Sequence, residues 1–141
     1  MPIHEMINKT QTTKHLAPAV YSTTQQPTAF DTTGCGKVGF LASVGTAGIT
    51  LSGTNKITLA LEESDDNSTF TTVAAADALG DGPTVTLDDN TKAGKNYRLD
   101  YKGKKQYVRV TATFAGTHGT GTPLCVNALA GEVKVMPVTN D

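Results

Sequence analysis

The chain has 141 residues, a length that accommodates one domain with its own hydrophobic core. Charged residues make up 18% and the formal net charge is -1. No basic run exceeds the turn at residues 102–105, which excludes the electrostatic footprint of a nucleic-acid-binding protein. The sequence has no apolar signal-like segment and no apolar run near ~18 residues, so we expect cytoplasmic synthesis and no membrane partner.

Residues 1–30 show little periodicity, and Pro18 and Pro27 exclude a helix interior. Within this polar stretch, a short apolar patch contains Leu16, Val20 and Tyr21. We expect an extended N-terminal arm over residues 1–30, followed by a β-sandwich domain over residues 31–141. Residues 1–8 fit a frayed terminus, whereas the apolar patch fits an arm that adds a strand to a neighbouring subunit.

Segments typical of strands follow at intervals of about 8 to 12 residues, separated by turn residues. They occupy residues 37–43, 49–52, 56–63, 69–75, 84–87, 124–130 and 132–138. Residues 74–79 allow one helical turn before the Gly80-Asp-Gly-Pro83 break. Amphipathic helices are absent from the pattern, so the sequence predicts an all-β fold, a single β-sandwich or a small β-barrel.

The strongest strand signal lies in residues 97–114. In its first half, Tyr97, Leu99 and Tyr101 alternate with polar residues. In its second half Val108 begins an alternation that continues to Phe114, the period of two that one buried face requires. Because residues 102–105 supply a glycine and charges between the halves, we predict a β-hairpin.

Two groups of residues raise the question of a chemical site. The acidic stretches at residues 65–67, 77, 81 and 88–90 lack the spacing of a calcium loop, and Asp and Asn are the usual turn residues. The loop at residues 116–121 is glycine-rich but lacks the Lys-Ser/Thr of a phosphate loop and precedes a strand. We therefore interpret these as turns and connections, with no metal and no cofactor.

The histidines, the aromatic residues and the cysteines are the remaining candidates for chemistry. The histidines are His4, His15 and His118, and nothing in the sequence places one beside a nucleophile and an orienting carboxylate. Without Trp, the chain lacks the best aromatic platform for a sugar cleft. Cys35 and Cys125 do not form a zinc-binding pattern, and cytoplasmic synthesis favours free thiols over a disulfide. We expect no enzyme activity.

Several segments together resemble a family of small tailed-phage virion proteins that are encoded beside the major capsid protein. They are Leu16-Ala-Pro-Ala-Val-Tyr21, Gly48-Ile-Thr-Leu-Ser-Gly-Thr-Asn-Lys-Ile57, Leu61-Glu-Glu-Ser-Asp-Asp-Asn-Ser-Thr-Phe70, Tyr97-Arg-Leu-Asp-Tyr-Lys-Gly-Lys-Lys-Gln-Tyr-Val-Arg-Val110 and Phe114-Ala-Gly-Thr-His-Gly-Thr-Gly-Thr-Pro123. The similarity extends over most of the chain from residue 16. It implies a decoration (cement) protein on the outer surface of the capsid, made in the host cytoplasm, with no catalytic residues.

The implied partners are the major capsid protein and copies of the chain itself, arranged as a trimer at a symmetry axis. Residues that we expect to contact the capsid or another subunit are Leu16, Val20, Tyr21, Asp65, Asp66, Asn67, Thr117, His118 and Thr120. Two other functions remain open. One is a tail-tube, tail-terminator or head-completion protein, which would form a ring. The other is a carbohydrate- or host-binding β-module displayed on the particle.

Overall fold

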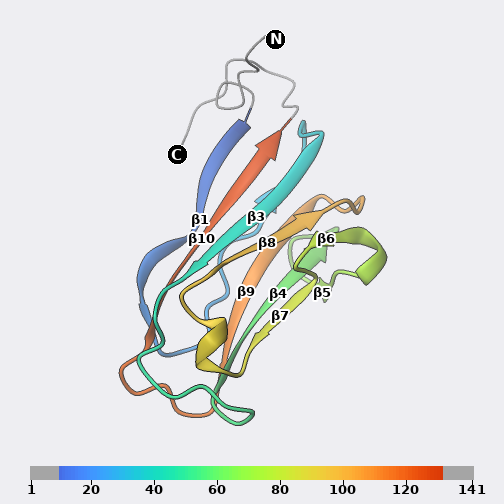
Figure 1. Cartoon of the computed structure of the whole chain (residues 1–141). Coiled ribbons are helices and arrows are strands. Elements are labelled where there is room, and N and C mark those ends of the chain that lie inside the picture. The colour runs from blue at the N-terminus through green and yellow to red at the C-terminus, as the bar shows by residue number, and fades with distance from the viewer. Residues whose placement is uncertain (1–9, 132–141) are drawn as a thin grey trace.

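In the computed structural model, which describes residues 10–131, two antiparallel sheets pack face to face as a β-sandwich. Sheet A has the strand order β1-β10-β3-β8-β6, and sheet B has the order β2-β9-β4-β5, with β7 also paired to β4. Figure 1 shows β1, β10 and β3 side by side in one layer and β9 and β4 in the other. The all-β sandwich that the sequence predicts is confirmed.

The strands vary in length from two to twelve residues. Those of sheet A are β1 (Thr10–Tyr21), β3 (Lys37–Val44), β6 (Ala78–Gly80), β8 (Asn96–Tyr101) and β10 (Thr122–Gly131). Those of sheet B are β2 (Phe30–Asp31), β4 (Lys56–Ser64), β5 (Thr71–Thr72), β7 (Thr84–Leu87) and β9 (Tyr107–Ala115). Two short 3-10 turns, η2 (Ala75–Asp77) and η3 (Asn90–Lys92), connect strands, and η2 lies where the sequence allowed a single turn.

The core lies between the sheets and is built from alternate residues of each long strand. In β10, for example, Val126 and Ala128 are buried while Cys125 and Asn127 are half-buried, the alternation expected of a strand with one face inward. Burying one such large apolar side chain stabilises the fold by about 1.5 to 3 kcal/mol. The largest fully buried apolar side chains are Phe40, Ile57, Leu59, Leu61, Leu87, Leu99, Val108, Val110 and Val126.

The predicted hairpin at residues 97–114 is wrong in its pairing, although both of its strands exist. β8 pairs with β3 and β6 in sheet A, whereas β9 pairs with β4 and β2 in sheet B. The connection at residues 102–106 therefore crosses from one sheet to the other. Alternation specifies which face of a strand is buried, and both strands do bury the predicted face, but it does not specify the neighbouring strand.

The N-terminal region also differs from expectation. Thr10–Tyr21 is not an arm outside the sandwich but β1, the outer strand of sheet A, paired to β10 along its length. Its hydrogen bonds are made within the chain, so the boundary that we drew between residues 30 and 31 does not separate two units. The first nine residues of the expected arm lie outside the described residues, as does the strand expected at 132–138.

Three other expected strands vary in outcome. Residues 84–87 form β7 as predicted. The segment expected at residues 69–75 is reduced to the two residues of β5, and residues 49–52 form no strand at all. In the latter segment, Leu51 donates its N–H to Asn90 Oδ1 at 2.6 Å, and Asn90 Nδ2 donates to the carbonyl of Ile49 at 3.2 Å. A side chain thus takes the place of a partner strand.

The edge of β9 that faces away from β4 is covered by side chains as well as by backbone groups. On that side of the strand, β2 pairs with Val108 and Gln25 forms an isolated bridge with Ala112. Between them, His15 Nε2 accepts the Val110 N–H at 3.0 Å, and beyond them Thr24 Oγ1 accepts the Phe114 N–H at 3.1 Å. Because unpaired strand edges invite association, this covering protects sheet B on one side.

Candidate functional site

The candidate contact residues other than Leu16 gather at two ends of the sandwich. Lys56, the first residue of β4, pairs with Ala115, which precedes the glycine-rich loop at residues 116–121. Ser64, the last residue of β4, pairs with Tyr107 and precedes the acidic turn at residues 65–69. β4 has 9 residues, and at about 3.3 Å per residue it separates the two ends by about 26 Å. The glycine-rich loop and the acidic turn therefore lie at opposite ends of β4.

The first end, which we call the glycine-loop end, contains residues 45–55, 88–95 and 116–123. Its loops are fastened to one another by hydrogen bonds. Gly48 N donates to the carbonyl of Gly121 at 3.0 Å, and the Thr120 hydroxyl donates to the carbonyl of Gly48. Asn55 Oδ1 accepts the Thr117 N–H at 2.9 Å. This end is a set of mutually braced loops, which positions Thr117 and Thr120 at the surface.

Val20 and Tyr21 lie beside this loop because β1 ends there. Tyr21 pairs with Thr122, and Val20 pairs with Pro123. Val20 is 61% exposed, the larger exposure of the two large hydrophobic side chains that stand out on the described surface. Tyr21 is half-buried and donates its hydroxyl proton to the carbonyl of Ala17 at 2.6 Å. The structure thus brings two predicted contact residues of β1 together with those of the loop.

An apolar groove of about 400 Å³ runs across the outer face of sheet A at this end. It is formed by three neighbouring strands, β1, β10 and β3, so its walls belong to the paired part of the sheet. Its lining residues are Pro18, Ala19, Val20, Ser43, Val44, Gly45, Pro123, Leu124 and Cys125. Such a groove offers apolar area to a partner without any rearrangement of the strands.

Two predicted contact residues lie in the interior. Leu16 is 8% exposed and belongs to the core, and His118 is 3% exposed. His118 Nε2 lies 2.9 Å from the carbonyl oxygen of Ala115, and its ring packs edge-on against Phe114 with centroids 4.9 Å apart. This burial removes both residues from the contact surface, and His118 instead braces the loop from inside.

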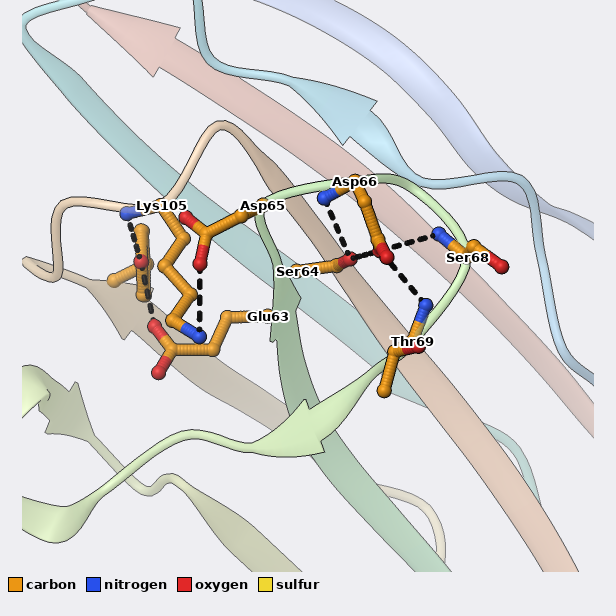
Figure 2. A network of polar contacts seen from close by, with 8 residues as sticks. Glu63, Ser64, Asp65, Asp66, Ser68, Thr69 and Lys105 are labelled. Carbon is orange, nitrogen blue, oxygen red and sulfur yellow. Dashed lines mark hydrogen bonds and ion pairs between the residues drawn. The ribbon is translucent and has the colours of Figure 1, made fainter.

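The second end, which we call the acidic-turn end, is organised around Asp66. Figure 2 shows its carboxylate turned back toward the backbone of its own loop. Oδ1 accepts the N–H of Ser68 at 2.9 Å and of Thr69 at 2.8 Å, and the Ser64 hydroxyl at 2.9 Å. These bonds, those to Thr69 and Ser68 first, lower the pKa of Asp66 to about 2. Asn67 takes the left-handed conformation, with φ of 56°, that closes the turn.

Other side chains tie this turn to the crossing between the sheets. Lys105 Nζ lies 3.2 Å from Asp65 Oδ2, as Figure 2 shows. The Tyr101 phenol donates to Glu63 Oε2 at 2.6 Å and accepts the Lys105 N–H at 2.8 Å. The polar groups of this end therefore pair mainly with one another. Among residues 10–131, no three His, Cys, Asp or Glu side chains lie close enough to hold a metal ion.

A second cavity, of about 690 Å³, opens at the acidic-turn end. Its walls include the crossing at residues 102–105, Cys35 and the exposed Leu79. The Cys35 thiol is free, and burial, followed by the charge of Asp31, raises its pKa, which makes it a weak nucleophile at neutral pH.

The residue that sequence reasoning missed is His15. It falls within the N-terminal arm that the sequence predicts, yet its ring lies between the sheets, 4.8 Å from the ring of Phe40 by centroid and bonded to Val110. Burial, with a contribution from the charge of Arg109, lowers the pKa of His15 to about 4. No local signal could have revealed this, because Val110 is separated from His15 by 95 residues.

None of the helices among the described residues has the length and apolarity needed to cross a membrane. A scan against known protein families finds no match, and neither does a search of curated proteins. Among solved structures, the chain is similar to the crystal structure of PBSX exported protein XepA, with 19% identity and a TM-score of 0.55. The match covers 99% of this chain but 42% of XepA, so this chain spans less than half of that protein's length, and the two share a fold.

Proposed function

We propose that this chain is a structural protein of a tailed-phage particle, seated on the outer surface of the capsid as a decoration protein. Two observations support the proposal. The sequence resembles small virion proteins over most of its length from residue 16. Its fold is similar, across 99% of the chain, to XepA, a phage-related protein.

The glycine-loop end is the side that we assign to the capsid. The observation that carries this assignment is the exposed Val20, which stands in the apolar groove beside the braced loop at residues 116–121. Apolar area at the centre of a contact supplies most of its binding energy, and a loop that is already fixed loses little entropy on binding. The acidic turn, whose carboxylates are engaged with their own loop and with Lys105, then faces away from the shell.

The partners in this proposal are the major capsid protein and further copies of the chain. Many identical copies on one lattice allow a modest contact at each site to stabilise the whole shell, since their effects combine. We expect the copies to gather at symmetry axes as trimers. Light scattering on the purified chain and on the chain released from particles measures that state.

The test uses capsid shells that lack the protein. Purified chain is mixed with shells and sedimented. We expect the chain to co-sediment until the binding sites on the shells are filled, so that no free chain remains while sites are in excess. Val20→Asp should weaken binding by at least about tenfold, because it places a charge in an apolar contact. Leu79→Asp is the matched control, since Leu79 is also exposed, at 51%, but lies at the other end.

The outcomes test the decoration function separately from the choice of the end that contacts the capsid. A wild-type chain that stays in the supernatant at every concentration would overturn the decoration function. Binding that Val20→Asp leaves intact and Leu79→Asp removes would keep the function and reverse the assigned end. The neighbour's name, exported protein, supports a second candidate, a phage-encoded protein released from the cell. Recovery of the chain in culture medium, apart from particles, would favour that role.

A further inference from the structure

His15 occupies an irregular position in β1. The register of β1 on β10 shifts between Lys14, which pairs with Asn127, and Leu16, which pairs with Val126. His15 is the extra residue at this shift, so the strand bulges there. A β-bulge redirects the side chain of its extra residue. Here the imidazole leaves sheet A and reaches the edge of β9 in sheet B.

Among the described residues, the imidazole is the one group that accepts the N–H of Val110. On that edge of β9, the N–H groups of Val108 and Ala112 face β2 and Gln25, and Val110 N–H meets His15 Nε2 at 3.0 Å. A nitrogen that accepts a hydrogen bond carries no proton, so the ring is neutral with its proton on Nδ1. Protonation of Nε2 would turn this bond into a repulsion between two N–H groups and would place a charge against Phe40.

The charged neighbours of His15 do not favour its protonated form. On β9, Arg109 acts on the ring and is paired with Glu62 of β4 at 2.7 Å. On β1 itself, Lys14 is exposed and adds a second positive charge nearby in sequence. The ring contact from β3 is the uncharged Phe40, and the β10 residues on either side of the register shift, Val126 and Asn127, are also uncharged.

β1 is held mainly by its ladder with β10, and it makes few contacts with sheet B. Of its twelve residues, Leu16, at 8% exposed, is the one that is buried. Its ladder with β10 is interrupted at two positions, before and after Leu16. Segments with few buried apolar contacts open at a lower free energy than the rest of a fold. The cross-sheet bond of His15 is thus one of the few contacts that join β1 to sheet B.

From this arrangement we propose that His15 is an acid-sensitive latch, and that its protonation releases β1 from the sandwich while the other strands remain folded. The released strand leaves β10 as a new sheet edge that can accept a strand from another copy. This inference does not depend on the role that the protein has in a particle.

The difference in the pKa of His15 between the docked and the released strand sets the size and direction of the pH effect on opening. The pKa of His15 is about 4 when the strand is docked and 6.5, the ordinary value, when it is released. The released state therefore binds more protons below pH 6.5, so docking weakens as the pH falls from 6.5 towards 4. At pH 5 the equilibrium constant for opening should be about 30-fold larger than at pH 8.

Amide hydrogen exchange on the full chain tests the proposal. After correction for the pH dependence of chemical exchange, amides of residues 10–21 should open about 30-fold more at pH 5 than at pH 8. Amides of β4 and β7 should not change. His15→Gln keeps an acceptor near Val110 without a titrating group, and in that variant the pH dependence should vanish. His118→Gln is the matched control and should retain it.

Equal changes in all strands, or an unchanged exchange rate in residues 10–21, would overturn the latch. So would the same pH dependence in His15→Gln as in the wild type. If His15→Gln does not fold, the titration of the His15 ring by NMR in the wild-type chain decides. A midpoint at the ordinary value of 6.5 contradicts the proposal, and a midpoint well below it, together with the exchange pattern, supports it.

Discussion

The Tyr101 phenol donates a 2.6 Å hydrogen bond to the Glu63 carboxylate, and this bond joins the last residue of β8 in sheet A to β4 in sheet B. The same phenol accepts the backbone N–H of Lys105 at 2.8 Å. Burial, followed by the bond to Glu63, raises the pKa of Tyr101, so the phenol stays protonated and remains a donor. One hydroxyl therefore fixes the chain where it crosses between the sheets.

Tyr101→Phe tests the contribution of this hydroxyl. The ring remains to fill the core, but Glu63 and the Lys105 N–H each lose a partner, and we expect unfolding to cost about 1 to 3 kcal/mol less. Urea denaturation at neutral pH measures the difference. The control is Tyr107→Phe, because the Tyr107 hydroxyl contacts the exposed Gln106 side chain and should contribute little. Equal effects of the two substitutions would contradict the bracing role of Tyr101.

A second prediction concerns Gly48, at the glycine-loop end. A Cβ at this position would collide with the carbonyl oxygen of Gly121 and with the Thr120 hydroxyl, two atoms that bond to Gly48. Gly48→Ala should therefore separate the loops and destabilise the fold by about 1 to 3 kcal/mol. Gly53→Ala is the control, since a Cβ there meets nothing within 4 Å. Thermal unfolding of both variants, with co-sedimentation on capsid shells, measures stability and binding together.

An unchanged melting temperature in Gly48→Ala would show that the loops are not braced through this contact. If the loops are braced and also face the capsid, Gly48→Ala should weaken shell binding while the control does not. Loss of stability with full shell binding would keep the bracing and contradict the assignment of this end to the capsid.

The alternation of apolar and polar residues predicted the central strands, which have a neighbouring strand on each side. β4 buries every second residue from Ile57 to Leu61 and β9 buries Val108, Val110 and Ala112, and their predicted bounds differ from the structure by at most one residue. Sequence reasoning did not predict β1 as a strand of the sandwich. Its first four residues are all Thr or Gln and show no apolar alternation, and the bulge at His15 breaks the period. Sequence reasoning also failed at residues 102–106, since a crossing between sheets and a hairpin turn use the same residue types.

The candidate site was predictable only in part, and for a related reason. Val20, Thr117 and Thr120 are exposed, as we expect of residues that contact a partner. That Val20 and the loop meet follows from the pairing of Tyr21 with Thr122, which no local pattern encodes. The burial of His118 is not predictable from the sequence, because a histidine in a polar loop gives no sign that Phe114 will cover it.

The cysteines make a third prediction. Gly36 N donates to the carbonyl of Gly131, so Cys35 lies beside the end of β10, whereas Cys125 pairs with Ser43 six residues earlier on that strand. That spacing is roughly 20 Å, and a disulfide requires Cα atoms within about 7 Å. We expect two free thiols on the unfolded chain by mass spectrometry after alkylation without reductant. In the folded chain, Cys35 should react more slowly than a small-molecule thiol, because its pKa is raised.

The last prediction concerns acid stability and Asp66. The folded chain holds the pKa of Asp66 at about 2, below the ordinary value of 3.8, because the carboxylate accepts backbone N–H groups of its own turn. A depressed folded pKa contributes stability above pH 3.8 that is lost as the pH falls from 3.8 through 2. Asp66→Asn keeps an acceptor oxygen but carries no charge, so urea denaturation between pH 5 and pH 2 should show a shallower decline.

Asp65→Asn is the matched control for this pH profile. It removes a carboxylate from the same turn, but one that contacts Lys105 Nζ and is exposed, so its contribution should be screened by salt. We expect its decline in acid to stay close to that of the wild type at 0.3 M salt, while that of Asp66→Asn differs. Identical profiles in all three chains would mean that the Asp66 carboxylate is as well solvated in the folded turn as in the unfolded chain. The turn would then be held by its backbone, and by Asn67 in the left-handed conformation, rather than by charge.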